Sequence, residues 1–142
     1  MPDYGISSGF APMYQGQVAF TSGNAATIFT ADLPTAGDVF SGTLVFHIQD
    51  SDGTDYQNIT QIAQFSAQNK AGTLTVDATY STTGQSKNVT AGTLTTTFTV
   101  TASSTTATYK ITPTSSLTLT TAYIKFTILT LFGNKLTSIS TT

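Results

Sequence analysis

Two stretches of this sequence alternate between apolar residues and threonine, and that alternation constrains the fold more than any other feature. In residues 72–81, Leu74 and Val76 fall on one side of the chain, whereas Thr73 falls on the other. Residues 92–102 repeat the pattern, with a polar side made almost wholly of threonine. Residues two apart share a face of a β-strand, so each stretch is predicted to be a strand with one buried and one solvated face.

Weaker signals of the same kind predict strands at residues 17–21, 27–31, 42–49, 107–112 and 123–132. About eight strands separated by turn residues are typical of a β-sandwich. That number of strands in 142 residues suits a jelly roll, and an immunoglobulin-like sandwich is the alternative. The predicted fold class is therefore all-β: an antiparallel, jelly-roll-like β-sandwich with an extended N-terminal arm.

Residues 56–68 fit two interpretations. As a strand, they place Ile59 and Phe65 on one face; as a helix, they align several glutamines at helical spacing. The strand is favoured, because residues 69–72 form a short turn into the strongly patterned strand that follows.

The alternation is irregular at two places near the C-terminal end of the sequence. Leu119 lies on the opposite phase from Ile124, so a bulge or break between Thr120 and Tyr123 must reset the alternation if one face stays buried. Further along, Leu129 and Leu131 face away from the apolar side that precedes them. This end of the last strand is therefore apolar on both sides, and we expect another part of the protein or a partner to cover it.

The composition excludes several classes of function. The chain has 32 threonines and 14 serines but no cysteine, arginine, glutamate or tryptophan. Without cysteine there is no disulfide, thiolate nucleophile or cysteine-bound zinc. Without arginine, and with a net charge of −2, there is no basic patch for nucleic acid. No apolar run is long enough to span a membrane, and the N-terminus does not resemble a signal peptide, so we expect no membrane partner and synthesis in the cytoplasm.

No set of residues indicates catalysis. His47, the single histidine, is predicted on the solvated face of its strand. Asp50, Asp52 and Asp55 form the densest group of carboxylates, which is the kind of ligand that calcium prefers. However, Gly53 does not have the spacing of an EF-hand loop, and the closing glutamate is absent. We therefore expect a polar turn at this segment, with no catalytic residue, metal or cofactor.

Residues 1–16 are predicted to be an extended arm that precedes a single sandwich domain, residues 17–142. The arm carries apolar side chains among glycine, proline and serine, without the alternation of a strand. Disordered tails are poor in such residues, so we expect the arm to lie against its own sandwich or a neighbouring subunit, docked on the apolar end of the last strand. The predicted interface residues are Tyr4, Ile6, Phe10, Met13, Tyr14, Leu129 and Leu131.

The chain resembles small virion β-sandwich proteins of tailed bacteriophages. The segments that carry the resemblance are residues 69–74 (NKAGTL), 108–113 (TYKITP) and 123–126 (YIKF). Capsid decoration, or cement, proteins are the closest in style, and tail-fibre head domains come next. The resemblance implies a homotrimer on a capsid lattice that performs no chemistry, and no site residue of the family can be assigned to a position here.

Three functions follow as hypotheses. The first is a structural virion protein, a capsid decoration protein that stabilises the capsid by bridging subunits, with itself and a major capsid protein as partners. The second is a receptor- or carbohydrate-binding module such as a tail-fibre head, which needs exposed aromatics, for which Tyr56, Tyr80 and Tyr123 are available. The third, an enzyme with paired aspartates, is disfavoured, because no residue set marks it.

Overall fold

The structure is a computed structural model that describes residues 14–80, 86–133 and 135–140. Throughout these residues the regular elements are β-strands, and no helix there is long and apolar enough to cross a membrane. The strands are β1 (Tyr14–Ala19), β2 (Ala26–Asp32), β3 (Val39–Ser51), β4 (Tyr56–Lys70), β5 (Thr73–Tyr80), β6 (Ser86–Val89), β7 (Leu94–Ser103), β8 (Thr106–Ser115), β9 (Thr121–Phe132) and β10 (Leu136–Ile139).

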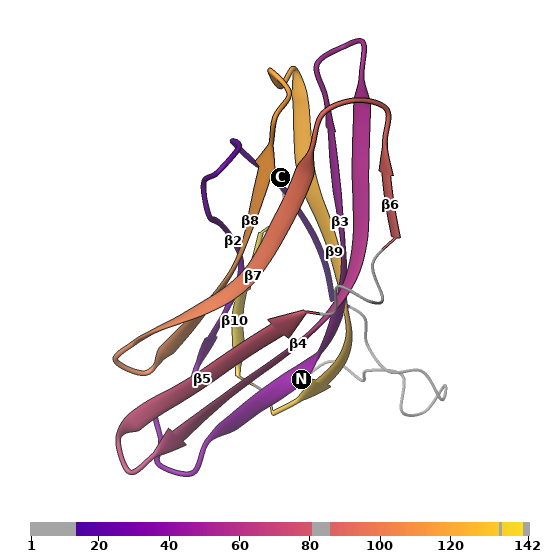
Figure 1. Cartoon of the computed structure of the whole chain (residues 1–142). Helices are drawn as coiled ribbons and strands as arrows, with labels where there is room; N and C mark the ends of the chain where they lie inside the picture. The colour runs from indigo at the N-terminus through magenta and orange to yellow at the C-terminus, as the bar shows by residue number, and fades with distance from the viewer. Residues whose placement is uncertain (1–13, 81–85, 134, 141–142) are drawn as a thin grey trace.

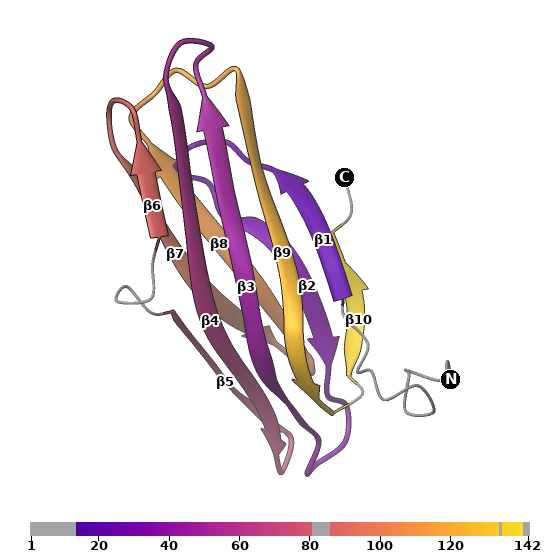
Figure 2. The same ribbon diagram turned by 90° about the vertical axis from the view of Figure 1, so that its right-hand side faces the viewer.

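The strands form two antiparallel sheets packed face to face (Figure 1). The larger sheet has the order β1-β9-β3-β4-β5, and β6 pairs with β4 beyond the end of β5, which makes six strands. The smaller sheet has the order β10-β2-β8-β7. Figure 2 faces the larger sheet, with the smaller sheet behind it. The predicted all-β sandwich is confirmed.

Each predicted strand corresponds to an observed strand. Residues 56–68 lie within β4, so the strand interpretation is confirmed and the helical alternative is wrong. The sequence did not predict β6 and β10, which are four residues long each. β1 begins at Tyr14, so residues 14–16 belong to the sheet rather than to the predicted arm.

Aromatic side chains fill the space between the sheets. The ring of Phe29 on β2 lies 4.6 Å from that of Tyr109, 5.0 Å from that of Phe65 and 6.3 Å from that of Phe40, measured between centroids. Ring pairs of this kind contribute about 0.5–1.5 kcal/mol each beyond the area they bury. The Tyr109 hydroxyl donates to the main-chain oxygen of Ser66 at 2.9 Å, which joins β8 to β4 across the core.

A β-bulge in β9 explains why the alternation fails near the end of the sequence pattern. The register with β3 shifts at Leu129, which has no Cα partner in that strand. The extra residue resets the phase, so Ile128 and Leu131 both face the core although they are three residues apart. Phe132 consequently faces outward, with 68% of its surface exposed. The alternation does fail past Thr127, but the prediction that Leu129 and Leu131 share a face is wrong, because the bulge turns Leu131 toward the core. The break predicted between Thr120 and Tyr123 falls slightly earlier, in the loop between β8 and β9, because residues 121–123 pair regularly with β3.

The threonine face expected on the 92–102 stretch lies on β7. The single inward threonine, Thr96, is buried and donates to Gln61 Oε1 on β4 at 3.3 Å. This contact satisfies a hydroxyl that would otherwise be unpaired between the sheets. The exposed threonines of the strand are Thr95, Thr97, Thr99 and Thr101.

Candidate functional site

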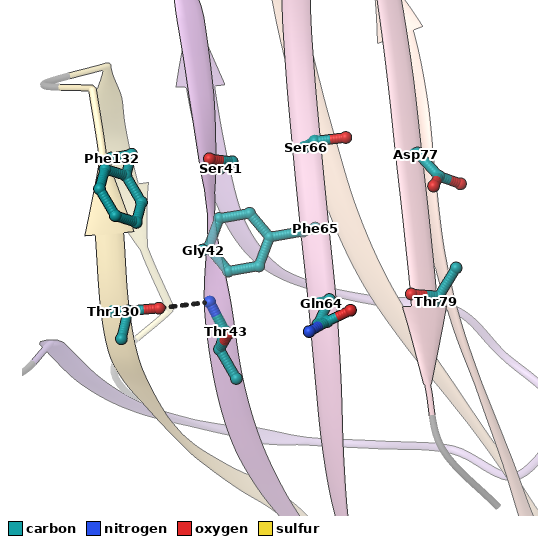
Figure 3. A pocket seen from close by; sticks show the side chains of 10 residues that line it. All are labelled: Ser41, Gly42, Thr43, Gln64, Phe65, Ser66, Asp77, Thr79, Thr130 and Phe132. Atoms are coloured by element: carbon teal, nitrogen blue, oxygen red, sulfur yellow. Dashed lines mark hydrogen bonds between the residues drawn. The ribbon is translucent and has the colours of Figure 1, made fainter.

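The outer face of the six-stranded sheet carries a shallow polar hollow of about 340 Å³ (Figure 3). Two rows of paired residues line it, with one residue in each row from β9, β3, β4 and β5. Strands about 4.8 Å apart place the two ends of a row about 14 Å from each other. In strand order, the first row is Phe132, Ser41, Ser66 and Asp77, and the second is Thr130, Thr43, Gln64 and Thr79.

The polar hollow is shaped by the bulge of β9. The main-chain N–H of Thr43 donates to the side-chain oxygen of Thr130 at 3.0 Å (Figure 3). Gly42 lies beside this bond, and a Cβ there would collide with the main-chain oxygen of Thr130 and lie 2.7 Å from Cζ of Phe65. Only glycine fits at this position, and the missing side chain lets β9 approach β3 closely.

The two ends of the polar hollow differ in chemistry. Phe132, at one end, is the most exposed large apolar side chain among the described residues. Asp77 presents a carboxylate at the other end, and the hydroxyls and the Gln64 amide lie between them. An aromatic ring offers an apolar surface to C–H groups, and the polar side chains offer both donors and acceptors. This lining matches a ligand that carries C–H and O–H groups side by side.

A second depression on the same face, the basic hollow, has a volume of about 540 Å³. It contains His47, which is exposed as predicted and whose Nδ1 lies 2.9 Å from Thr60 Oγ1. Lys125 is the Cα partner of His47 on β9, and its ammonium lies 5.1 Å from the centroid of the Tyr123 ring. The remaining lining residues are Gln15, Gly16, Gln17, Phe126 and Thr127.

The acidic segment of residues 50–55 is partly buried in the core and partly in an exposed turn. Asp52 Oδ1 accepts hydrogen bonds from the N–H groups of Asp55 at 2.8 Å and Thr54 at 2.9 Å, which lower the pKa of Asp52. The polar turn is thus confirmed for Asp52. For Asp50 it is wrong, because β3 extends to Ser51 and carries Asp50 into the core. In the part of the chain that the structure describes, no group of three or more acidic or histidine side chains could hold a metal.

Asp50 is fully buried, and neither of its carboxylate oxygens has a hydrogen-bond partner among the described residues. The nearby Ser115 hydroxyl donates to Gln57 Oε1 at 3.1 Å. Burial disfavours the charged form of Asp50 and raises its pKa. A buried carboxylate with no partner destabilises a fold unless it is protonated.

The predicted interface residues are only partly within the structure. Tyr14 is the half-buried first residue of β1 and pairs with Ile128, directly before the bulge. Leu129 is 42% exposed, whereas Leu131 is half-buried against the core. The bulged end of β9 thus leaves Leu129 and Phe132 uncovered by the described residues. Four predicted interface residues lie outside the described residues: Tyr4, Ile6, Phe10 and Met13.

The aromatic residue of the polar hollow is not one that the sequence singled out for binding. Of the three tyrosines named, Tyr56 is 56% exposed, Tyr80 is half-buried, and Tyr123 donates to Gln49 Oε1 at 2.8 Å. None of the three lines the polar hollow. The sequence signal for Phe132 was the failed alternation that precedes it.

No protein-family model matches the sequence, and no curated protein matches it significantly. The structure is similar to part of the tailspike protein of Acinetobacter baumannii phage AM24, with a TM-score of 0.45 and 12% identity over 87% of this chain and 26% of that one. It is also similar to part of the tailspike protein of Acinetobacter phage vB_ApiP_P1, with a TM-score of 0.39 and 11% identity over 88% of this chain and 22% of that one. The chain thus spans about a quarter of the length of these proteins.

Proposed function

We propose that this chain is a carbohydrate-binding module, and that it binds a glycan in the polar hollow. One observation carries the proposal: the exposed ring of Phe132 stands at one end of a hollow that is otherwise lined by hydroxyls, an amide and the carboxylate of Asp77. Ligand sites typically combine an apolar contact surface with a few placed polar groups, and a sugar ring offers complementary C–H and O–H groups.

The proposed role is binding without chemistry. The hollow is shallow, so a single site is expected to be weak, and several copies in one particle would raise the overall avidity. A homotrimer in a phage virion, as the sequence resemblance implies, would provide such copies. On this proposal the module serves receptor binding by the virion, which was the second of the sequence-based hypotheses.

The test is a glycan array followed by titration of any glycan that binds. Phe132→Ala is expected to weaken binding by roughly tenfold or more, because it removes the ring on which the sugar lies, a loss of about 1.4 kcal/mol or more. Asp77→Asn is expected to weaken binding less, since it keeps the shape of the side chain. Tyr56→Ala is the matched control, as it removes an exposed aromatic of the same sheet outside the hollow. Equal affinity of Phe132→Ala and wild type would refute the proposal.

Capsid decoration is the second candidate, and exposed apolar surface favours it. Leu129, Phe132 and Val39 are all more than two-fifths exposed and lie on the neighbouring strands β9 and β3. An uncovered apolar surface of this kind is typical of a contact with another protein. Co-sedimentation with capsids tests it: Leu129→Ser should abolish attachment if this surface binds a capsid protein. Attachment at the wild-type level would leave glycan binding as the explanation for the exposed ring.

A further inference from the structure

The basic hollow contains Lys125, whereas the charged residue of the polar hollow is Asp77. The glycan contact proposed above does not involve this lysine. We infer that the basic hollow binds the carboxylate of an acidic sugar, so that the glycan held by this face is anionic. The inference rests on the proposed function, because it concerns a second contact of the same ligand.

The geometry brings Lys125 and His47 side by side in the basic hollow. Gln17, Lys125, His47 and Thr60 form a single row of Cα partners across β1, β9, β3 and β4. Lys125 and His47 are direct neighbours in this row, about 4.5–5.5 Å apart at their Cβ atoms, so their polar ends can reach a common group. Because Nδ1 of His47 contacts Thr60, Nε2 is the ring nitrogen that remains for a ligand.

The charges of the basic hollow favour an anion. None of the described residues that line it carries a carboxylate. Among the described residues the ion pair is that of Lys135 with Asp38, which leaves Lys125 without a carboxylate partner there. The Tyr123 ring stabilises the ammonium through its π face and does not neutralise its charge. Lys125 lies directly beside His47, its Cα partner on β3, so the basic hollow places a cation next to a second nitrogen donor.

A single oligosaccharide can reach both hollows. Thr43 in the polar hollow and His47 in the basic hollow are four residues apart on β3, which is about 13 Å along a strand. Val45 and the 47%-exposed Ile62 form a pair between them on the same face, which gives the glycan an apolar surface to cross. The carboxylate of Asp77 repels an acidic sugar from the far end, so the ligand should bind in one direction only.

The inference is tested by titrating the whole chain with uronic-acid and sialic-acid oligosaccharides and with the methyl ester of each. The acid forms should bind roughly tenfold more tightly than the neutral esters, a difference of about 1.4 kcal/mol, and added salt should reduce that difference. Lys125→Gln should remove the preference for the acid form. Lys110→Gln on β8 is the matched control, because it makes the same change of charge on the smaller sheet.

The outcomes separate this inference from the proposed function. Equal affinity for acids and esters, or an equal loss of preference in both lysine variants, would overturn the inference. If neutral glycans bind through Phe132 while no acidic glycan is preferred, the proposed function stands and the acidic contact is wrong. If no glycan binds at all, both are wrong.

Discussion

Replacing Asp50 by asparagine is expected to stabilise the protein at neutral pH. The side chain is fully buried, and its two oxygens have no hydrogen-bond partner among the described residues. An unsatisfied buried polar group costs about 1–3 kcal/mol, and a charged one costs more. Asparagine keeps the shape and removes the charge, and its amide can donate to the Gln57 side chain, which faces it from β4. We therefore expect a gain of about 1–3 kcal/mol in the free energy of unfolding at pH 7.

The gain should depend on pH in a defined direction. Burial raises the pKa of Asp50 in the folded state above its ordinary value. Its contribution to stability is therefore full below the pKa of the unfolded chain and is lost as the pH rises through the folded pKa. Wild type and Asp50→Asn should consequently be nearly equal in stability at pH 3, and the variant should become progressively more stable toward pH 7.

Urea denaturation across this pH range measures both effects. Asp77→Asn is the control, since it removes the same charge from an exposed position and should change the stability by less than about 0.5 kcal/mol. Two results would refute the reasoning: a variant no more stable than wild type at pH 7, or a difference in stability that is the same at every pH.

Three further substitutions test the packing, each by urea denaturation. Gly16→Ala should destabilise by about 1–3 kcal/mol, because its Cβ would collide with the buried ring of Phe126 and with main chain. Asn69→Ala should cost about 1–3 kcal/mol, because it leaves the main-chain oxygen of Leu33, now 2.8 Å from the Asn69 amide, without a buried donor. Tyr109→Phe should cost about 1 kcal/mol, because it removes one hydrogen bond between the sheets and leaves the ring stacking intact.

The strands were predictable from sequence because their signal is local. The alternation of Leu74 and Val76 with threonine needs only period two, and β5 follows it closely. β6 and β10 were not predictable, since four residues hold too little of a pattern to stand out. Asp50 was misplaced for a related reason: its charge suggests a turn, while β3 continues through it.

The residues of the candidate site were harder to predict from the sequence than the strands of the fold. Ser41 and Asp77 are 36 positions apart in the sequence, and they share a row only because β4 pairs with both β3 and β5. The exposure of Phe132 depends on a bulge, and the sequence showed this bulge only as a break in phase. His47 was correctly placed on the solvated face, but its neighbour Lys125 comes from a strand that the chain forms much later.

Deleting the bulge residue Leu129 tests how the sequence of β9 determines which of its side chains point outward. If Leu129 is the extra residue, its deletion should restore a regular ladder with every other pair of β9 and β3 unchanged. Leu129 is 42% exposed, so the loss of stability should be below about 1 kcal/mol, and Phe132 should still face outward.

Deleting Lys125 instead is the matched control for stability. This deletion would move the side chains of the next three residues to the opposite face of the sheet. Phe126 and Ile128, which are only 2% and 1% exposed, would then lie on the outer face. Exposing two such side chains should cost about 3–6 kcal/mol. If the two deletions destabilise the protein equally, Leu129 does not act as the residue that resets the phase. In that case Phe132 owes its outward position to some other feature of β9.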